Sequence, residues 1–201
     1  MSCSGGDGWS DAPSQTLRAK SRWRYAADAK MKSPIVLLTD FGHADPYVGV
    51  MKGVILSFCP KAIIVDLCHE IPPQDVRAAA FALMSSAAYF PRRTLFVLVV
   101  DPGVGSKRRI LWARTALYRF LAPDNGLLSW FPDPIEDLRS VENRKLFLPE
   151  VSATFHGRDI FAPVAGRLAE GLRPARLGPR VKNCLRLPFP EPKKAPRGLK
   201  G

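Results

Sequence analysis

The segment VLVVDPGVGSKRR, residues 97–109, decides the predicted fold. Its first four residues are apolar, and Asp101 follows them directly, ahead of a Pro-Gly-Val-Gly turn. An uninterrupted apolar strand bounded by Gly and Pro is typical of a parallel sheet that is covered on both faces. Open α/β sheets bind ligands at the carboxyl ends of such strands. The segment therefore predicts either a site that uses Asp101 and Arg108 or an ordinary strand end whose Asp is satisfied by the turn.

Strand and helix patterns alternate ahead of this segment. The expected strands cover residues 35–39, 62–65 and 94–100. Between them, helices begin after Asp45 and after Asp75, where an acid can cap the first turn. This order predicts parallel strands joined by crossover helices. We therefore expect an α/β fold with a mainly parallel sheet and helices on both faces.

The pattern changes after the central segment. Two short apolar stretches, residues 110–114 and 118–121, are close enough to predict an antiparallel hairpin. A turn is expected at residues 124–126, and a last helix is expected to end at Gly171. The sheet should therefore carry an antiparallel addition at one side.

The 201-residue chain has a net charge of +12, most of it near the two ends. Residues 1–33 contribute +3 and residues 173–201 contribute +8, which leaves +1 for residues 34–172. Basic ends of this kind are typical of disordered or solubilising segments. We therefore expect a disordered N-terminal extension (1–33), one α/β domain (34–172) and a basic, Pro-rich tail (173–201). No nucleic-acid partner is expected, because nucleic-acid readers carry their positive charge on a folded face.

Cysteine and hydropathy patterns bear on the compartment and on metal binding. The four cysteines form no CxxC pair, no stretch reaches the roughly 18–20 apolar residues of a spanning helix, and the N-terminus lacks the apolar core of a secretory signal. No set of His, Cys and carboxylate residues has metal-ligand spacing. We therefore expect a cytoplasmic protein with no membrane partner and no metal site.

Three acids follow expected strands: Asp40, Asp66 and Asp101. Parallel strands would bring these carboxylates to one edge of the sheet, where they could accept hydrogen bonds from ribose hydroxyls or attract a cationic ligand. The alternative is that each acid only caps the loop or helix that follows it. His156 lies in a Gly-flanked loop ahead of a helix and is a candidate general base, with a structural role as the alternative.

Five segments occur in a fixed order along the chain: LLTDFGHADPYVGVMKGVI, IVDLCHEIPPQDVRAAAFAL, VVDPGVGSKRR, APDNGLLS and TFHGRDIFAPVA. This series resembles the S-adenosyl-L-methionine hydroxide adenosyltransferases, which are related to fluorinating and chlorinating enzymes that use the same substrate. The resemblance covers about residues 34–172 and implies the N-terminal α/β domain of that family. It also implies hydrolysis of S-adenosyl-L-methionine to adenosine and L-methionine, by attack of water at ribose C5′ and without a cofactor.

The resemblance also implies roles for individual residues. The implied catalytic residues, which activate the water, are Asp101, Arg108 and His156. The implied substrate-binding residues are Asp40, Thr154, Asn125 and Arg158. Asp40 would hold the ribose hydroxyls, and Thr154 would line the ribose and methionine end of the pocket. The halogenating relatives differ at the positions of Asp101 and His156, so these residues favour water over halide as the nucleophile.

Members of the family carry a second, C-terminal β domain and assemble as trimers whose sites lie between subunits. After residue 172 the sequence predicts no set of strands, so we expect that domain to be absent. A homotrimer is implied if such a domain is supplied. The alternative function is a truncated, non-catalytic nucleoside-binding or interaction module of the same fold. A third alternative, a nucleic-acid binder, rests only on the basic tails.

Overall fold

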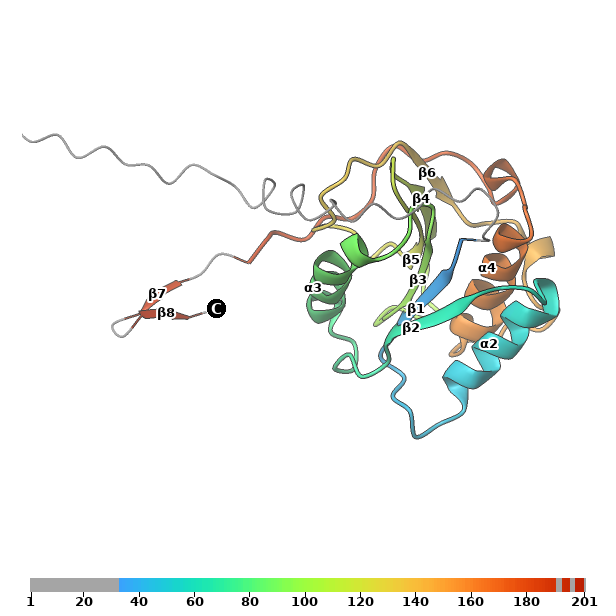
Figure 1. The fold of residues 1–201 in the computed structure, drawn as a ribbon, viewed down its shortest axis with the longest axis horizontal. Helices are drawn as coiled ribbons and strands as arrows, with labels where there is room; N and C mark the ends of the chain where they lie inside the picture. The colour runs from blue at the N-terminus through green and yellow to red at the C-terminus, as the bar shows by residue number, and fades with distance from the viewer. Residues whose placement is uncertain (1–32, 191–192, 196–197, 201) are drawn as a thin grey trace, which may run out of the picture.

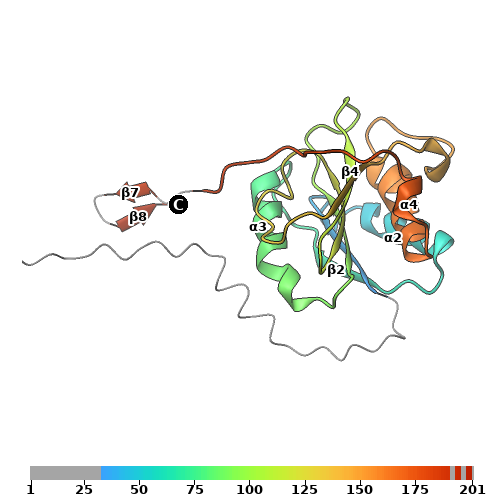
Figure 2. The same ribbon diagram turned by 90° about the horizontal axis from the view of Figure 1, so that it is seen from above.

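A computed structural model describes residues 33–190, 193–195 and 198–200 of the chain (Figure 1). The disordered extension expected over residues 1–33 lies outside the described residues, except for Ser33. The described part of the chain folds around one six-stranded sheet with helices on both faces, as the sequence predicts (Figures 1 and 2). None of the helices within it is long and apolar enough to cross a bilayer.

The sheet is parallel on one side and antiparallel on the other. Its strands are β1 (Ile35–Thr39), β2 (Ile64–Cys68), β3 (Leu95–Val99), β4 (Ile110–Arg114), β5 (Arg119–Pro123) and β6 (Asp137–Ser140). They lie in the order β2-β1-β3-β5-β4-β6, with parallel pairing from β2 to β5. Strand β4 pairs antiparallel with both β5 and β6, which confirms the predicted hairpin.

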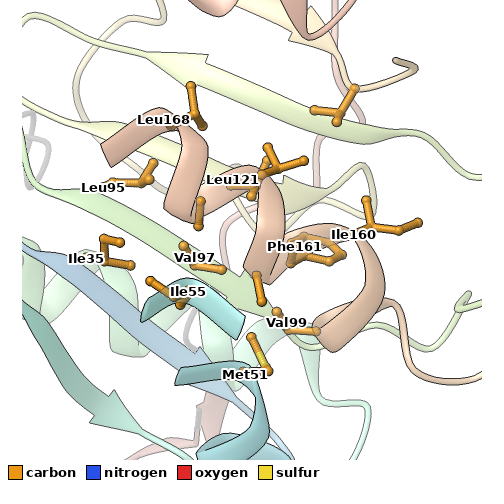
Figure 3. Close-up of a cluster of buried hydrophobic side chains, with 14 of the residues drawn as sticks. Ile35, Met51, Ile55, Leu95, Val97, Val99, Leu121, Ile160, Phe161 and Leu168 are labelled. Atoms are coloured by element: carbon orange, nitrogen blue, oxygen red, sulfur yellow. The ribbon is translucent and has the colours of Figure 1, made fainter. Parts of the chain in front are cut away.

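Two apolar layers hold the helices on the sheet. The helices are α2 (Tyr47–Phe58), α3 (Val76–Ser86) and α4 (Ala162–Ala169). Alternate residues of β1 and β3 face a cluster with α2 and α4, and the residues between them face a cluster with α3. Figure 3 shows the first cluster, in which Ile35 and Val97 of the sheet lie near Ile55 of α2 and Leu168 of α4. Both faces of β1 and β3 are buried, which explains their unbroken apolar sequences.

Local capping signals predicted the start of α3 correctly and the cap of α2 incorrectly. Helix α3 begins as expected, because the Asp75 side chain accepts a hydrogen bond from the Ala78 amide at 2.9 Å. Helix α2 instead has Pro46 at its N-cap and no side-chain cap, so the predicted capping role of Asp45 is wrong. Short packed helices tolerate a missing cap because burial of the apolar face supplies most of their stability.

Strand β2 begins and ends later than the sequence predicts. Asp66 lies within the strand, in register with Leu37 of β1, rather than at the strand's carboxyl end. The strand is at the edge of the sheet, and Asp66 is exposed there, so a carboxylate is tolerated inside it. The expectation that three acids share one sheet edge therefore holds only for Asp40 and Asp101.

The segment after residue 172 is packed on the domain up to about Pro188. Leu177 is fully buried, and the Val181 amide donates to the Leu138 carbonyl of β6 at 2.9 Å. Figure 2 shows this segment crossing the molecule from α4 toward the side of α3. Beyond it, β7 (Lys193–Ala195) and β8 (Gly198–Lys200) form a two-stranded antiparallel pair, where the sequence predicts no strands.

Candidate functional site

The candidate site lies at the carboxyl ends of the two central strands. Strands β1 and β3 pair in parallel register, with Thr39 opposite Val99. Asp40 follows the first strand directly and Asp101 follows the second after one further residue, so both acids lie at the same edge of the sheet. This is the edge at which open α/β sheets bind ligands.

Asp101 and Arg108 form a two-point ion pair across a tight loop. The Arg108 Nε atom donates to Asp101 Oδ1 at 2.6 Å, and its Nη2 atom donates to Oδ2. The Gly103 amide donates to the same Oδ1 atom at 3.1 Å. The carboxylate is only 5% exposed and the guanidinium side chain 12% exposed, so the pair is largely removed from water. Asp101 therefore fixes the direction of the guanidinium.

The guanidinium of Arg108 remains charged at neutral pH. Burial lowers its pKa to about 10, and the nearby charge of Asp124 opposes that change. The result is a fixed positive charge next to the sheet edge. Such a charge can stabilise an anion but cannot accept a proton.

His156 lies beside this ion pair, at the start of a π-helical turn over Gly157–Phe161 that leads into α4. Gly157 packs closely there: a Cβ atom would lie 3.1 Å from Met51 Sδ and 3.2 Å from the Phe41 ring, a tight fit. His156 and Arg108 line one cavity of about 430 Å³, and His156 also lines an adjoining cavity of about 710 Å³. The close packing of Gly157 on α2 thus places the imidazole at the junction of both cavities.

The environment keeps the His156 imidazole neutral. Desolvation lowers its pKa below 6.5, the positive charge of Arg108 lowers it further, and Asp159 partly offsets the effect. The Nδ1 atom is buried and has no hydrogen-bond partner in the part of the chain that the structure describes. A neutral imidazole that lines a cavity can accept a proton from a bound water or ligand.

Cations dominate the walls of the two cavities. The charged lining residues are Lys107, Arg108, Arg109, Arg144, Lys145 and Glu142. Lys107, Arg144 and Lys145 form no ion pair with another described residue. A positive potential of this kind favours hydroxide character in a bound water and a carboxylate on a bound ligand.

Asp40 and Asn125 are engaged by backbone groups near the same edge. The Gln74 amide donates to Asp40 Oδ2 at 2.8 Å. The Asn125 side chain donates to the Val100 carbonyl at 2.9 Å, and its oxygen accepts from the Leu127 amide at 3.2 Å. Asn125 therefore holds the end of β3 in place just ahead of Asp101.

Thr154 and Arg158 lie on the segment around His156. Thr154 is exposed, and its hydroxyl lies 3.2 Å from the Ser152 hydroxyl. The Arg158 Nε atom donates to the buried Asp159 at 2.6 Å, and its guanidinium lies 5.0 Å from the Phe155 ring centre. Neither Thr154 nor Arg158 lines the two cavities, and the same is true of Asp40. Of the predicted site residues, the structure thus groups Asp101, Arg108 and His156 most closely.

Sequence reasoning missed an aromatic surface at this edge. The rings of Phe41, Tyr47 and Phe155 meet edge to face, with centroid distances of 5.0 to 5.9 Å. Tyr47 is 44% exposed, so the group is open to solvent on one side. Phe41 and Tyr47 belong to one motif segment and Phe155 to another, more than 100 residues away, and only the fold brings them together.

The described residues show no metal centre: no three His, Cys, Asp or Glu side chains among them gather closely enough to hold an ion. The polar groups at the sheet edge are instead an ion pair, an imidazole and a carboxylate with one amide partner. This set suits hydrogen bonding and proton transfer.

Comparison with known proteins adds independent information. The family model for the SAM hydroxide adenosyltransferase N-terminal domain matches residues 35–178. An (R)-S-adenosyl-L-methionine hydrolase of Thermus thermophilus is 45% identical over 167 residues, a match that covers 78% of this chain and 65% of that protein. A protein of the same name from Salinispora tropica is 41% identical, with 78% of this chain and 61% of that protein covered.

A more distant relative and a solved structure also match this chain. A fluorinase of Nocardia brasiliensis is 29% identical, with 73% of this chain and 57% of that protein covered. The crystal structure of an uncharacterized conserved protein from Thermotoga maritima superposes with a TM-score of 0.75 at 42% identity, over 79% of this chain and 63% of that one. The chain therefore spans less than two thirds of the length of these proteins.

Proposed function

Since the chain belongs to the SAM hydroxide adenosyltransferase family, we propose that it hydrolyses S-adenosyl-L-methionine to adenosine and L-methionine. The observation that carries this proposal is the neutral His156 imidazole beside the Arg108 guanidinium, which Asp101 holds in place. The names of the relatives from Thermus and Salinispora support the choice of substrate.

In the proposed reaction, a lone pair of water forms the bond to C5′ of the ribose. The C5′–S bond breaks at the same time, and its electrons neutralise the sulfonium, so methionine leaves as a neutral thioether. The water gives up one proton, which the His156 imidazole accepts. General-base assistance of this kind contributes a factor of about 10² to 10⁴ in rate. The thioether needs no proton, so the reaction calls for no general acid, metal or redox cofactor.

Arg108 and Asp101 act on the water in a different way. The guanidinium stabilises the negative charge that develops on the attacking oxygen, and the two-point bond to Asp101 holds it in one direction. Because the carboxylate is nearly enclosed, Asp101 works mainly through Arg108. A water held in line with the C5′–S bond gains further from the reduced entropic cost of attack.

The other residues would bind the substrate. Asp40 would accept hydrogen bonds from the ribose hydroxyls, Thr154 would line the ribose and methionine end, and Arg158 would also contact the substrate. Asn125 keeps the β3 end in position for them. If a C-terminal domain is supplied, we propose a homotrimer in which that domain adds contacts to adenine.

Product analysis tests the proposal directly. The purified protein is incubated with S-adenosyl-L-methionine in ¹⁸O-water, and adenosine is analysed by chromatography and mass spectrometry. We expect adenosine with ¹⁸O in its 5′-hydroxyl, and losses of at least about 100-fold on His156→Ala and on Asp101→Ala. Lys61→Ala is the control, because this exposed side chain lies just ahead of β2, at the amino ends of the parallel strands and away from the site. Stoichiometric adenosine binding without turnover would instead favour a non-catalytic nucleoside-binding module.

A further inference from the structure

A row of polar side chains connects β1 to β2 next to the loop that carries Asp40. Thr39 and His69 are 0% and 1% exposed, and the Thr39 hydroxyl lies 2.8 Å from His69 Nδ1. On the other side of the ring, His69 Nε2 lies 3.0 Å from Asp66 Oδ1. That approach is too bent for a well-aligned hydrogen bond and acts as a close electrostatic contact. A buried imidazole with partners on both nitrogens is costly to disturb.

The residues around His69 determine which atoms donate and which accept along this row of polar side chains. Partial burial raises the pKa of Asp66, but the hydrogen bond from Lys52 and the close approach of the His69 ring outweigh it and lower that pKa overall. Asp66 is therefore an anion that can only accept, which places the imidazole proton on Nε2 and leaves Nδ1 to accept from the Thr39 hydroxyl. The Thr39 oxygen in turn accepts the Phe41 amide at 3.3 Å.

The loop that carries Asp40 is held from two further points. The Gly42 amide donates to the His69 carbonyl at 2.8 Å. Across the edge, the Gln74 amide donates to Asp40 Oδ2 at 2.8 Å, and Gln74 adopts the left-handed region with φ of 65° to do so. Asp40 Oδ1 has no partner among the described residues, so one carboxylate oxygen is anchored and the other is open to a ligand.

We propose that His69 is a positioning residue, which acts through Thr39 to fix the loop after β1 so that Asp40 presents its free oxygen to the ribose hydroxyls. The inference rests on the proposed function, in which Asp40 binds the ribose. His69 is nearly fully buried and does not touch the substrate. Its contribution therefore belongs to recognition of the ribose rather than to the attack on C5′.

Thr39→Val tests the link with least disturbance, because it removes the hydroxyl and keeps the shape of the side chain. The measurement is the affinity for adenosine relative to 2′,3′-dideoxyadenosine, by calorimetry. We expect the native protein to prefer adenosine and Thr39→Val to weaken that preference about fivefold, the typical effect of one lost hydrogen bond. Thr39→Ser keeps the hydroxyl and should keep the preference. If the substitution only disturbed the structure in general, the affinities for both ligands would fall equally.

His69→Gln provides a second variant, because its amide can face Asp66 but offers no acceptor at the Nδ1 position. Amide hydrogen exchange gives a readout that needs no ligand. In both Thr39→Val and His69→Gln, we expect faster exchange at Phe41, Gly42 and Gln74, with α4 unchanged.

The outcomes separate the two proposals. Unchanged exchange at these amides together with an unchanged ligand preference overturns the positioning role of His69. If the native protein itself does not prefer adenosine, the ribose-binding role of Asp40 fails and the inference fails with it, even where exchange shows that the loop is held. Faster exchange together with a lost preference supports both.

Discussion

At the scale of single residues, the charge of Arg108 lowers the proton affinity of His156, in addition to the larger effect of burial. Desolvation and this charge both lower the pKa of the imidazole from 6.5. We predict that Arg108→Gln raises the pKa of His156, because the like charge disappears while the burial remains. The shift is measured by NMR, from the pH dependence of the His156 Hε1 and Cε1 resonances.

The lowered pKa of His156 also predicts in which direction the rate changes with pH. A base must be neutral to work, so kcat should fall as pH falls through the His156 pKa, at a value below 6.5. Lys107→Gln is the matched control, since it removes an exposed neighbouring cation and should leave that pKa unchanged. An acid limb above 6.5, or an unshifted resonance in Arg108→Gln, would contradict this account.

The sequence predicted some contacts of the site and not others. Asp101 and Arg108 lie seven residues apart around a Gly-containing turn, so their pairing could be anticipated from the segment itself. His156 is 48 residues further along; its Gly-flanked loop marked it as a candidate base, but only the family resemblance grouped it with this pair. The contact of Gln74 with Asp40 had no signal at all, because a backbone amide donates whatever its side chain is.

At the scale of the elements, the loop between β3 and β4 is shaped by one close backbone approach. Gly105 has φ of +78°, and a Cβ atom there would lie 2.6 Å from the Ala153 carbonyl oxygen, just ahead of the His156 segment. We predict that Gly105→Ala lowers the free energy of unfolding by about 1–3 kcal/mol and lowers kcat, because the loop must move away from that segment. Urea unfolding and adenosine release measure the two effects.

Gly103→Ala is the control from the same loop. Its added Cβ would meet the Ser106 hydroxyl at 3.3 Å and the Arg108 side chain at 3.4 Å, and its φ is not in the left-handed region. Side chains can yield where a carbonyl cannot, so Gly103→Ala should cost less stability. Equal losses in the two variants would show that the approach to Ala153 does not shape the loop.

The elements were predictable where burial dominated their sequence. Strands β1 and β3 are buried on both faces and are apolar throughout, so their positions were evident. Strand β6 was missed because its four residues alternate half-buried charged side chains with Leu138 and Ser140. Strand β2 was misplaced because its edge position lets Asp66 sit inside it.

At the scale of the whole molecule, the segment after residue 172 supports the site from the outside. Asp124 accepts from Arg109 at 2.6 and 2.9 Å and from the Leu185 amide at 2.7 Å. The Arg109 guanidinium also donates to the Asn183 carbonyl at 3.1 Å. These contacts connect the segment to the residue next to Arg108. Its Pro- and Arg-rich composition predicted only a tail, because most of its anchors are backbone groups that have no periodic pattern.

Leu177 is the apolar anchor of this segment, and it belongs to the same core cluster as α2 and α4. It is fully buried, so Leu177→Ala should lower the free energy of unfolding by about 2–5 kcal/mol through lost burial and the remaining cavity. Leu185→Ala makes the same chemical change at a side chain that is 49% exposed, and should cost less than about 1 kcal/mol. Chemical denaturation of the two variants makes the comparison. If both lose the same small amount, residues 173–188 lie on the domain without stabilising it, and the folded unit ends where the sequence alone placed its boundary.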